Sequence, residues 1–377
     1  MDQQAAQAHT DLLFRPLDIG RMHLRNRIVM APMTREFAPT GVPGPEIAAY
    51  YRRRAEGGTG LIITEGAPPD LPGSFSALIP RAYGEDALAG WKYVTDEIHA
   101  ANSAVILQLW HVGAFVPSLI GMKDSLPEGT PRLSPSGLGG PDKPFGTAMT
   151  ERDIEEAIDA FASAAVFAQR AGMEGVEFHG AHGYIFDQFF WEATNKRSDR
   201  WGGDLPGRMR FATEAVAEAR RRVGPDFLLC FRFSQWKQLD YRAVMLPTPA
   251  LFGQFLGRLV DAGVDILHCS TRRFWEPGFE GSDLTLAGWT RKLTGKPTIA
   301  VGSVSLNADL KAKGGAVRAE IVPEDVAKIV ACMERDEFDL IAVGRALLAN
   351  PDWAEKVRSG RLSELVSYAP EHRENLV

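Results

Sequence analysis

Eight short runs of apolar, mostly β-branched residues recur along this chain of 377 residues, and six of them are followed by an amphipathic helical stretch. Each run is continuously apolar, without regular alternation, which is typical of parallel strands buried on both faces. The runs lie at residues 28–31, 61–64, 105–109, 175–179, 227–233, 266–269, 298–301 and 340–343. The helical stretches lie at residues 47–55, 87–100, 150–171, 207–223, 248–262 and 323–334.

This count favours an α/β fold, a closed (β/α)8 TIM barrel, over a doubly wound open sheet. The runs leave no obvious edge strand, and no G-x-G-x-x-G turn follows the first of them. The length alone fits two domains, but a barrel needs about 250 residues before insertions. We therefore expect a single domain over residues 1–377, with a barrel core at about 24–358.

The surplus length predicts an N-terminal lead-in and long excursions after strands three and six, at residues 110–148 and 271–284. Both excursions follow the C-terminal end of a strand, so they overhang the face where barrel active sites lie. The second excursion carries Phe274 and Trp275. These aromatic residues predict either a lid over a flat ligand or a hydrophobic cluster that holds the loop down.

Charge and cysteine content exclude several kinds of protein. The 42 basic and 48 acidic side chains give a net charge of -6, which is unfavourable for binding nucleic acid. The three cysteines are far apart, so no zinc or iron–sulfur site is expected. The polar N-terminus and the lack of an apolar run of about 20 residues predict a cytoplasmic protein that is not in a membrane.

Strand four ends with His179, His182 and Tyr184, at the predicted C-terminal mouth of the barrel. Two imidazoles there can donate hydrogen bonds to one substrate oxygen and polarise it, as an oxyanion hole does. Zinc binding by the two histidines is the alternative, but no carboxylate or cysteine follows closely enough to be a third ligand. We therefore expect no metal.

Strands seven and eight end with small residues that expose backbone N–H groups. Gly302 and Ser303 follow strand seven, and Gly344 and Arg345 follow strand eight. Barrels frequently hold phosphate in the loops after these two strands, and an arginine binds it in a bidentate manner. The sequence predicts a phosphate site here.

The other strand ends carry groups suited to a heterocycle. The amide of Gln108 and the guanidinium of Arg232 can form hydrogen bonds with the edge of a ring that presents donors and acceptors. No lysine lies at a predicted strand end, so a Schiff base has no candidate nucleophile. Together with the phosphate site, these groups predict a bound mononucleotide cofactor beside a carbonyl substrate. They are Pro32, Met33 and Thr34 after strand one, Ala67 after strand two, Gln108 in strand three and Arg232 in strand five.

In seven segments, over almost its full length, the chain resembles the Old Yellow Enzyme family of FMN-dependent ene-reductases. The segments are specific because they occur together and in the right order. They lie at residues 24–35, 50–58, 108–111, 179–184, 187–190, 195–203 and 344–352.

The resemblance implies an NAD(P)H-dependent flavin oxidoreductase with FMN at the barrel mouth. Pro32, Met33, Thr34, Ala67 and Gln108 would contact the flavin. Further contacts are implied for Arg232 at its N1/O2 edge and for Gly302, Ser303, Gly344 and Arg345 at the phosphate.

By the same resemblance, NADH or NADPH reduces FMN, and an activated alkene such as an α,β-unsaturated carbonyl then enters the pocket. His179 and His182 would bind the carbonyl oxygen, the β-carbon would receive hydride, and Tyr184 would protonate the α-carbon. A phenol with a pKa near 10 is a suitable donor for this proton. Phe274 and Trp275 would shape the substrate side, and a homodimer is a possible assembly.

Two alternatives remain open within this fold. One is an FMN-dependent oxidoreductase of the dienoyl-CoA or amine type, which carries an iron–sulfur cluster and is disfavoured by the three scattered cysteines. The other is a flavin-binding barrel without turnover, which would not need Tyr184.

Overall fold

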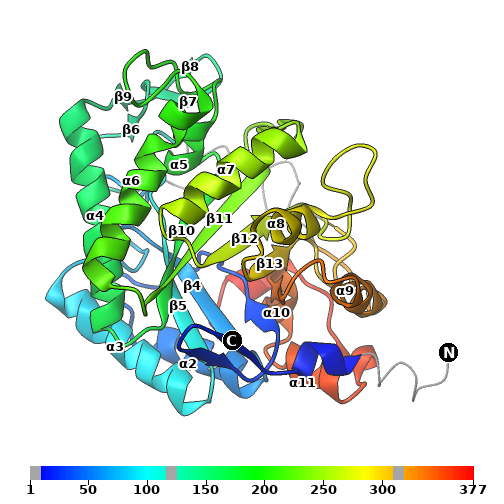
Figure 1. Cartoon of the computed structure of the whole chain (residues 1–377). Helices are drawn as coiled ribbons and strands as arrows, with labels where there is room; N and C mark the ends of the chain where they lie inside the picture. Colours follow the sequence, from blue (N-terminus) through cyan, green and yellow to red (C-terminus); the bar gives the residue numbers. More distant parts are fainter. Residues whose placement is uncertain (1–9, 116–124, 309–317) are drawn as a thin grey trace.

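The computed structural model describes residues 10–115, 125–308 and 318–377. Eight parallel strands close into a barrel in the order β10-β11-β12-β13-β14-β3-β4-β5 (Figure 1). This confirms the predicted fold class, and all eight predicted strands are present. The strands are β3 (Ile28–Met30), β4 (Leu61–Ala67), β5 (Ala104–Leu109), β10 (Gly175–His182), β11 (Leu228–Lys237), β12 (Ile266–Ser270), β13 (Thr298–Val301) and β14 (Leu340–Val343).

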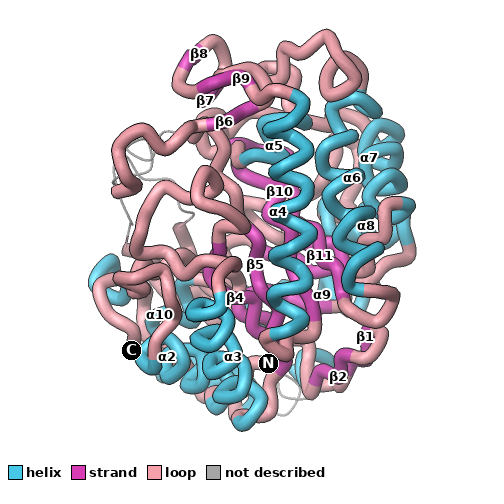
Figure 2. The backbone as a smooth tube through the Cα atoms, turned by 90° about the vertical axis from the view of Figure 1, so that its left-hand side faces the viewer, coloured by secondary structure: helices cyan, strands magenta, loops and turns pink. Residues whose placement is uncertain are grey.

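Helices pack around the outside of these strands, as Figure 2 shows for α4 in front of β10 and β5. The predicted start of α4 is confirmed, because Thr150 and Asp153 form a reciprocal capping box. The helices are α2 (Pro45–Glu56), α3 (Glu85–Ala100), α4 (Glu151–Arg170), α5 (Ile185–Phe190), α6 (Leu205–Val223), α7 (Pro249–Asp261), α8 (Leu286–Thr294), α9 (Asp325–Glu334), α10 (Arg345–Ala349) and α11 (Trp353–Arg358), with 3-10 turns η1 (Asp11–Phe14), η3 (Leu362–Glu364) and η4 (Pro370–Arg373).

Four helices were not predicted from the sequence. Three of them, α5, α10 and α11, have only five or six residues, too few to show a helical period. The fourth, α8, follows the excursion after β12 and has nine residues, with Thr285 as its N-cap. The units after β12 and β14 are therefore complete βα units.

The barrel wall separates two sets of apolar side chains. Phe178 on β10 and Phe231 on β11, for example, face outward and pack among the helices. The opposite set fills the barrel interior, and we call it the apolar floor. It consists of Ile19, Met22, Leu24, Val29, Ala31, Leu61, Ile63, Ala104, Ile106, Leu228, Cys230, Ile266, Ile299, Val301, Leu340 and Ala342.

The two ends of the barrel are covered by different small sheets. The hairpin of β1 (Leu17–Ile19) and β2 (Met22–Leu24) closes the N-terminal ends of the strands and contributes Ile19, Met22 and Leu24 to the apolar floor. Beyond the opposite end lie β6 (Leu133–Ser134), β7 (Leu138–Gly140), β8 (Lys143–Pro144) and β9 (Thr147–Ala148), which belong to the predicted excursion after strand three (Figures 1 and 2).

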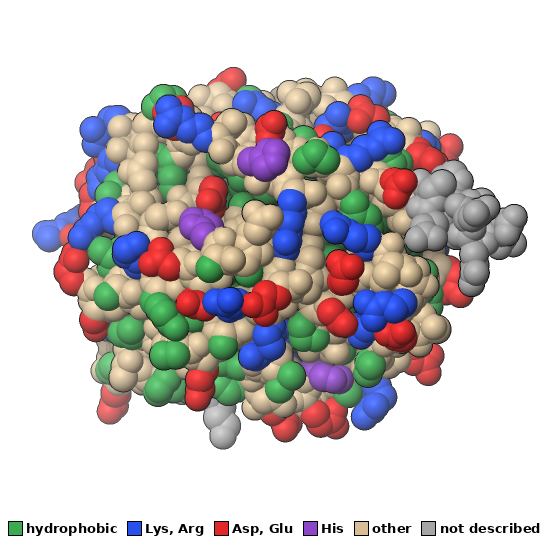
Figure 3. Space-filling model, turned by 90° about the horizontal axis from the view of Figure 1, so that it is seen from below, with side chains coloured by type: hydrophobic (Ala, Val, Ile, Leu, Met, Phe, Trp, Pro, Cys, Tyr) green, Lys and Arg blue, Asp and Glu red, His purple; other side chains and the backbone are tan. Residues whose placement is uncertain are grey.

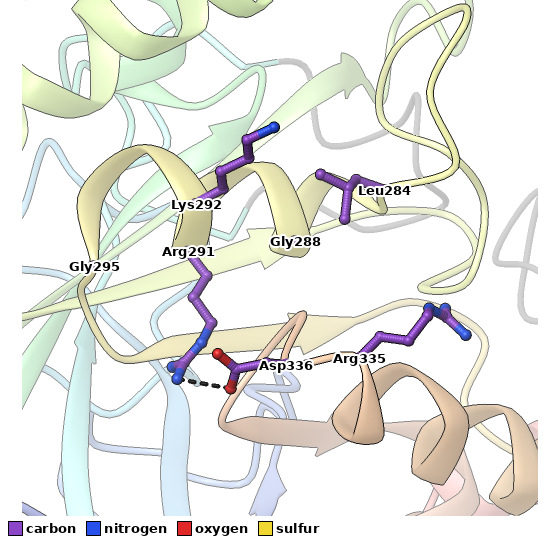
Figure 4. A pocket seen from close by; sticks show the side chains of 7 residues that line it. All are labelled: Leu284, Gly288, Arg291, Lys292, Gly295, Arg335 and Asp336. Atoms are coloured by element: carbon purple, nitrogen blue, oxygen red, sulfur yellow. Dashed lines mark ion pairs between the residues drawn. The ribbon is translucent and has the colours of Figure 1, made fainter.

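The surface seen in Figure 3 carries basic and acidic side chains side by side, with small separate apolar groups between them. One surface cavity, of about 390 Å³, lies along α8 and beside the C-terminal end of α9 (Figure 4). Residues from Leu284 to Gly295, together with Arg335 and Asp336, line it. None of these residues belongs to the predicted site.

In the described part of the chain, none of the helices combines the length and the apolar character that crossing a bilayer requires.

Candidate active site

The barrel interior becomes polar toward the C-terminal ends of the strands. In the register of the sheet, Glu177 lies opposite Gln108, and Arg232 lies between His179 and His268. All of these side chains are buried. We call this set the polar mouth: Gln108, Glu177, His179, Arg232, His268 and Ser270.

The three residues predicted at the end of strand four lie together. The ring centroid of His179 is 5.0 Å from that of His182 and 4.9 Å from that of Tyr184. The backbone turns sharply between them, with φ of 68° at His182 and 89° at Gly183. A positive φ is costly for a histidine, and such strain is found mostly at functional sites.

A buried ion pair holds this turn in place. Asp187 on α5 accepts a hydrogen bond from the Gly183 backbone N–H at 2.7 Å. Its other carboxylate oxygen lies 2.5 Å from Nζ of Lys237, and both side chains are fully buried. The expectation that no lysine lies at a strand end was wrong, because β11 extends beyond Phe233 to Lys237.

Both histidines of the site are held neutral. Burial, followed by the charge of Arg232, lowers the pKa of His179 and of His182 well below the usual value. The Ala181 N–H donates to Nδ1 of His179 at 3.3 Å, so Nε2 carries the proton of the neutral ring. Nε2 of His182 lies 2.7 Å from the Ser270 hydroxyl.

Tyr184 is buried and remains protonated. Burial raises the pKa of its phenol well above 10, and Nε2 of Gln238 donates to its hydroxyl at 3.3 Å. The phenol O–H is therefore available as a proton donor throughout the neutral pH range.

Aromatic side chains that sequence reasoning did not assign to the site surround these three residues. Trp110 and Phe115 pack against Tyr184, with ring centroids 5.0 and 5.1 Å away. On the other side, Trp236 stacks on His182 at 4.5 Å and on Tyr241 at 5.3 Å. Trp110 and Phe115 follow β5, and Trp236 lies near the end of β11. This position at the C-terminal end of a strand is the signal in the sequence that could have identified them as site residues.

Arg232 is a buried cation without a carboxylate partner. Its Nη2 donates to the Ser270 hydroxyl at 3.3 Å, and its Nε has no hydrogen-bond partner. Within the described ranges, none of the carboxylates comes within ion-pair distance of it. A buried guanidinium of this kind requires an anionic or electron-rich partner.

The ends of β13 and β14 lie close to the end of β3. Ser303 has a φ of 47° and a buried hydroxyl with no hydrogen-bond partner. A Cβ at Gly302 would lie 2.7 Å from the Thr271 carbonyl oxygen, whereas a Cβ at Gly344 would meet nothing closer than Met33 Sδ at 3.8 Å. A Cβ at position 302 would therefore clash with the protein itself, whereas a Cβ at 344 would make only ordinary van der Waals contacts.

The remaining predicted residues lie around these ends. Pro32, Met33 and Thr34 are partly exposed after β3, and Ala67 is fully buried at the end of β4. Nη2 of Arg345 donates to the Ala308 carbonyl at 2.5 Å, and the guanidinium lies 5.6 Å from the centre of the Tyr368 ring. One of its nitrogen atoms is thus already used within the protein.

Phe274 and Trp275 are not brought next to the histidines by any contact. Phe274 is buried among the helices beside Phe338, with ring centroids 6.3 Å apart. Trp275 contacts Phe274 and lies under Nζ of Lys328 at 4.1 Å. These contacts match the alternative interpretation, a hydrophobic cluster that holds the loop after β12 in place.

None of the described residues form a group of three or more histidine, cysteine or acidic side chains that could hold a metal ion. Cys230, Cys269 and Cys332 are buried and unpaired.

Comparisons with known proteins agree with this geometry. The NADH:flavin oxidoreductase / NADH oxidase family matches residues 12–364. NADH oxidase of Thermoanaerobacter brockii is 33% identical over 95% of this chain, which spans 52% of that longer protein. 12-Oxophytodienoate reductase 7 of Oryza sativa subsp. japonica is 32% identical, covering 92% of this chain and 87% of its own length. A structure of morphinone reductase in complex with tetrahydroNAD has a TM-score of 0.78 and 27% identity, covering 96% of this chain and 93% of that one.

A closed parallel barrel with polar groups gathered at the C-terminal ends of its strands defines a barrel enzyme. The chain belongs to the NADH:flavin oxidoreductase / NADH oxidase family, which includes the Old Yellow Enzymes. It is an FMN-dependent NAD(P)H oxidoreductase of that family. The family predicted from the sequence motifs is thereby confirmed.

Proposed function

We propose that the protein is an ene-reductase that reduces activated alkenes such as α,β-unsaturated carbonyl compounds. The observation that carries this proposal is the cluster of neutral His179, neutral His182 and protonated Tyr184 within one buried turn. Two relatives support it by their names, 12-oxophytodienoate reductase and chanoclavine-I aldehyde reductase.

The residues at the strand ends fit FMN. Arg232 Nε and the Ser303 hydroxyl are buried polar groups without a partner, and both suit an anionic or electron-rich ligand. Gly344 presents its backbone without a side chain beside Met33, which suits a ligand that approaches the backbone.

In this proposal Pro32, Met33, Thr34, Ala67 and Gln108 contact the flavin ring. Two groups hold its charged parts: Arg232 at the pyrimidine edge, and Gly302, Ser303, Gly344 and Arg345 at the phosphate. Bound FMN supplies hydride that it takes from NADH or NADPH.

His179 and His182 would bind the substrate's carbonyl oxygen. Nε2–H of His179 is directed by the Ala181 hydrogen bond to Nδ1, whereas Nε2 of His182 must exchange its contact with Ser270 for the substrate. Because both rings are neutral, they donate hydrogen bonds without giving up a proton. They would therefore withdraw electron density from the β-carbon of the alkene.

Tyr184 would complete the reaction. Hydride adds to the β-carbon, the C=C electron pair moves toward the carbonyl, and the Tyr184 O–H delivers a proton to the α-carbon. One hydride and one proton thus convert the alkene to the saturated product. The phenolate left behind recovers its proton from solvent, and Gln238 is positioned to donate a hydrogen bond to it meanwhile.

The test is an anaerobic titration of the purified protein. We expect a yellow protein that bleaches with NADH or NADPH and regains its colour on addition of 2-cyclohexenone, with cyclohexanone as the product. Bleached protein that stays colourless with enones, maleimides and nitroalkenes would refute the ene-reductase proposal but would leave the family assignment intact.

A further inference from the structure

A carboxylate lies inside the barrel, in the part of the polar mouth that borders the apolar floor. Glu177 is fully buried on β10, two residues before His179 and on the same side of the strand. Burying a carboxylate is costly unless it is bonded, so its contacts need an explanation. The seven sequence segments and the proposed reaction leave this residue without a role.

Three strands supply hydrogen bonds to Glu177. Nε2 of Gln108 on β5 donates to Oε1 at 2.8 Å. Oε2 lies 2.5 Å from Nδ1 of His268 on β12 and accepts a weak hydrogen bond from Cys230 Sγ on β11 at 3.5 Å. The amide of Gln108 is therefore held by its nitrogen, and its oxygen remains as a hydrogen-bond acceptor.

Glu177 is the acidic group of this network. Burial opposes ionisation of Glu177, but His268, Arg232 and Gln108 outweigh it and lower the pKa of the carboxyl to about 2. Burial lowers the pKa of His268 although the nearby Glu177 opposes this, and its Nε2 has no hydrogen-bond partner. Glu177 is thus a fixed anion beside the cation Arg232, to which it is coupled by charge without a direct ion pair.

We propose that Glu177 is a positioning residue for FMN: it fixes the Gln108 amide and offsets the Arg232 charge, which lowers the reduction potential of the flavin. The inference rests on the proposed function, which places Gln108 and Arg232 at the ring. Reduction adds negative charge to the flavin, and a buried carboxylate near that edge disfavours this addition.

A purely structural role would have a different signature. A buried carboxylate that only completes hydrogen bonds contributes to folding, and its loss lowers stability without changing the flavin. The midpoint potential of bound FMN separates the two roles, because it responds to charge near the ring and not to the stability of the barrel.

The test variant is Glu177→Gln, which keeps the shape and removes the charge. Gln108 can still donate to the new amide oxygen, and His268 can change its tautomer to accept from the new amide nitrogen. We expect the midpoint potential of bound FMN to become more positive by at least about 30 mV. For a two-electron couple this corresponds to a tenfold change in the ratio of reduced to oxidised flavin at a fixed potential.

The matched control is Ile106→Val, in the apolar floor two residues before Gln108 on β5. It should lower the stability slightly and leave the potential unchanged. A Glu177→Gln potential equal to that of the wild type would overturn the inference. This result is distinct from failure of the proposed function, in which wild-type protein does not return to the oxidised state with any alkene.

A second variant, Glu177→Asp, tests the inference if Glu177→Gln folds poorly. Glu177→Asp keeps the charge but shortens the reach to Gln108, so apo-protein should bind FMN at least tenfold more weakly and show a shifted flavin absorption spectrum. If its FMN dissociation constant and spectrum match those of the wild type, the positioning role is wrong.

Discussion

The two ends of the barrel interior differ in the side chains that fill them. The apolar floor is built from aliphatic side chains and the β1–β2 hairpin. The polar mouth holds buried titratable groups, and the turns beside it contain His182 and Ser303 at positive φ. Stability and chemistry are thus separated along the barrel axis, with the floor supporting the strain and buried charge of the mouth.

The largest predicted effect is that of Tyr184→Phe on the rate of alkene reduction. Removing the hydroxyl deletes the proposed proton donor but keeps the ring packed against Trp110 and Phe115. Reduction of the flavin by NADH or NADPH should continue at the wild-type rate, whereas alkene reduction should slow by about 10²–10⁴-fold. Anaerobic stopped-flow absorbance measures both half-reactions. Equal slowing of the two would remove Tyr184 from the proton step.

Next in size is the effect of Lys237→Met on stability. The change leaves Asp187 as an uncompensated buried charge, and we expect a loss of about 3–5 kcal/mol in the free energy of unfolding. Lys92→Met is the control, because Lys92 forms an exposed pair with Asp96 at 3.2 Å and should cost less than about 1 kcal/mol. Urea denaturation measures both. Similar losses in the two variants would show that the buried pair has no special part in holding the turn.

Leu340→Ala, in the apolar floor, should lower the stability of the protein without changing its reaction rates. Leu340 is fully buried in the apolar floor, and truncating it should cost about 2–5 kcal/mol through lost burial and an unfilled cavity. Both half-reactions should keep their wild-type rates at a temperature where the variant is folded. A selective change in alkene reduction would contradict the separation between floor and mouth.

The smallest predicted effect is a pH dependence of stability that comes from His179 and His182. Burial lowers the pKa of His179 and His182, so the unfolded chain binds protons before the folded protein does. Their contribution is present above about pH 6.5 and is lost as the pH falls below it. Between pH 6.5 and 5.5, the free energy of unfolding should fall more in the wild type than in the double variant His179→Gln/His182→Gln. The difference should be up to about 1.4 kcal/mol for each histidine replaced.

Glu65 is buried and its pKa is raised to about 7 by burial, so it acts in the opposite direction over the same range. It is present in both proteins, and its effect cancels in their difference. Parallel pH profiles of the two proteins, from urea denaturation, would show that the histidines are not held neutral.

The sequence predicted the barrel because buried parallel strands have a strong local signature. Continuous apolar runs such as residues 340–343 mark a strand whatever surrounds it, and β14 has these same bounds. The short helices α5, α10 and α11 have no such period. The extension of β11 to Lys237 was missed because Ser234, Gln235 and Lys237 are polar residues that no local rule assigns to a strand.

Sequence reasoning could propose site residues that are close together in the chain at the end of a strand. It could not find contacts between residues that are far apart in the chain. His179, His182 and Tyr184 are neighbours in sequence. By contrast, the bonds that join Glu177 to Gln108 and to His268 span 69 and 91 positions and appear only when the barrel closes. The homodimer and the cytoplasmic location stay predictions.

The central claim is that His179 in the polar mouth and His182 in the turn beside it bind a substrate oxygen against the flavin. The direct measurement is titration of the FMN-loaded protein with a phenol, followed by its long-wavelength charge-transfer absorption. We predict a band for the wild type and its loss in His179→Ala/His182→Ala, which should still bleach with NADH or NADPH. An unchanged band in that variant would show that the two histidines do not bind the oxygen.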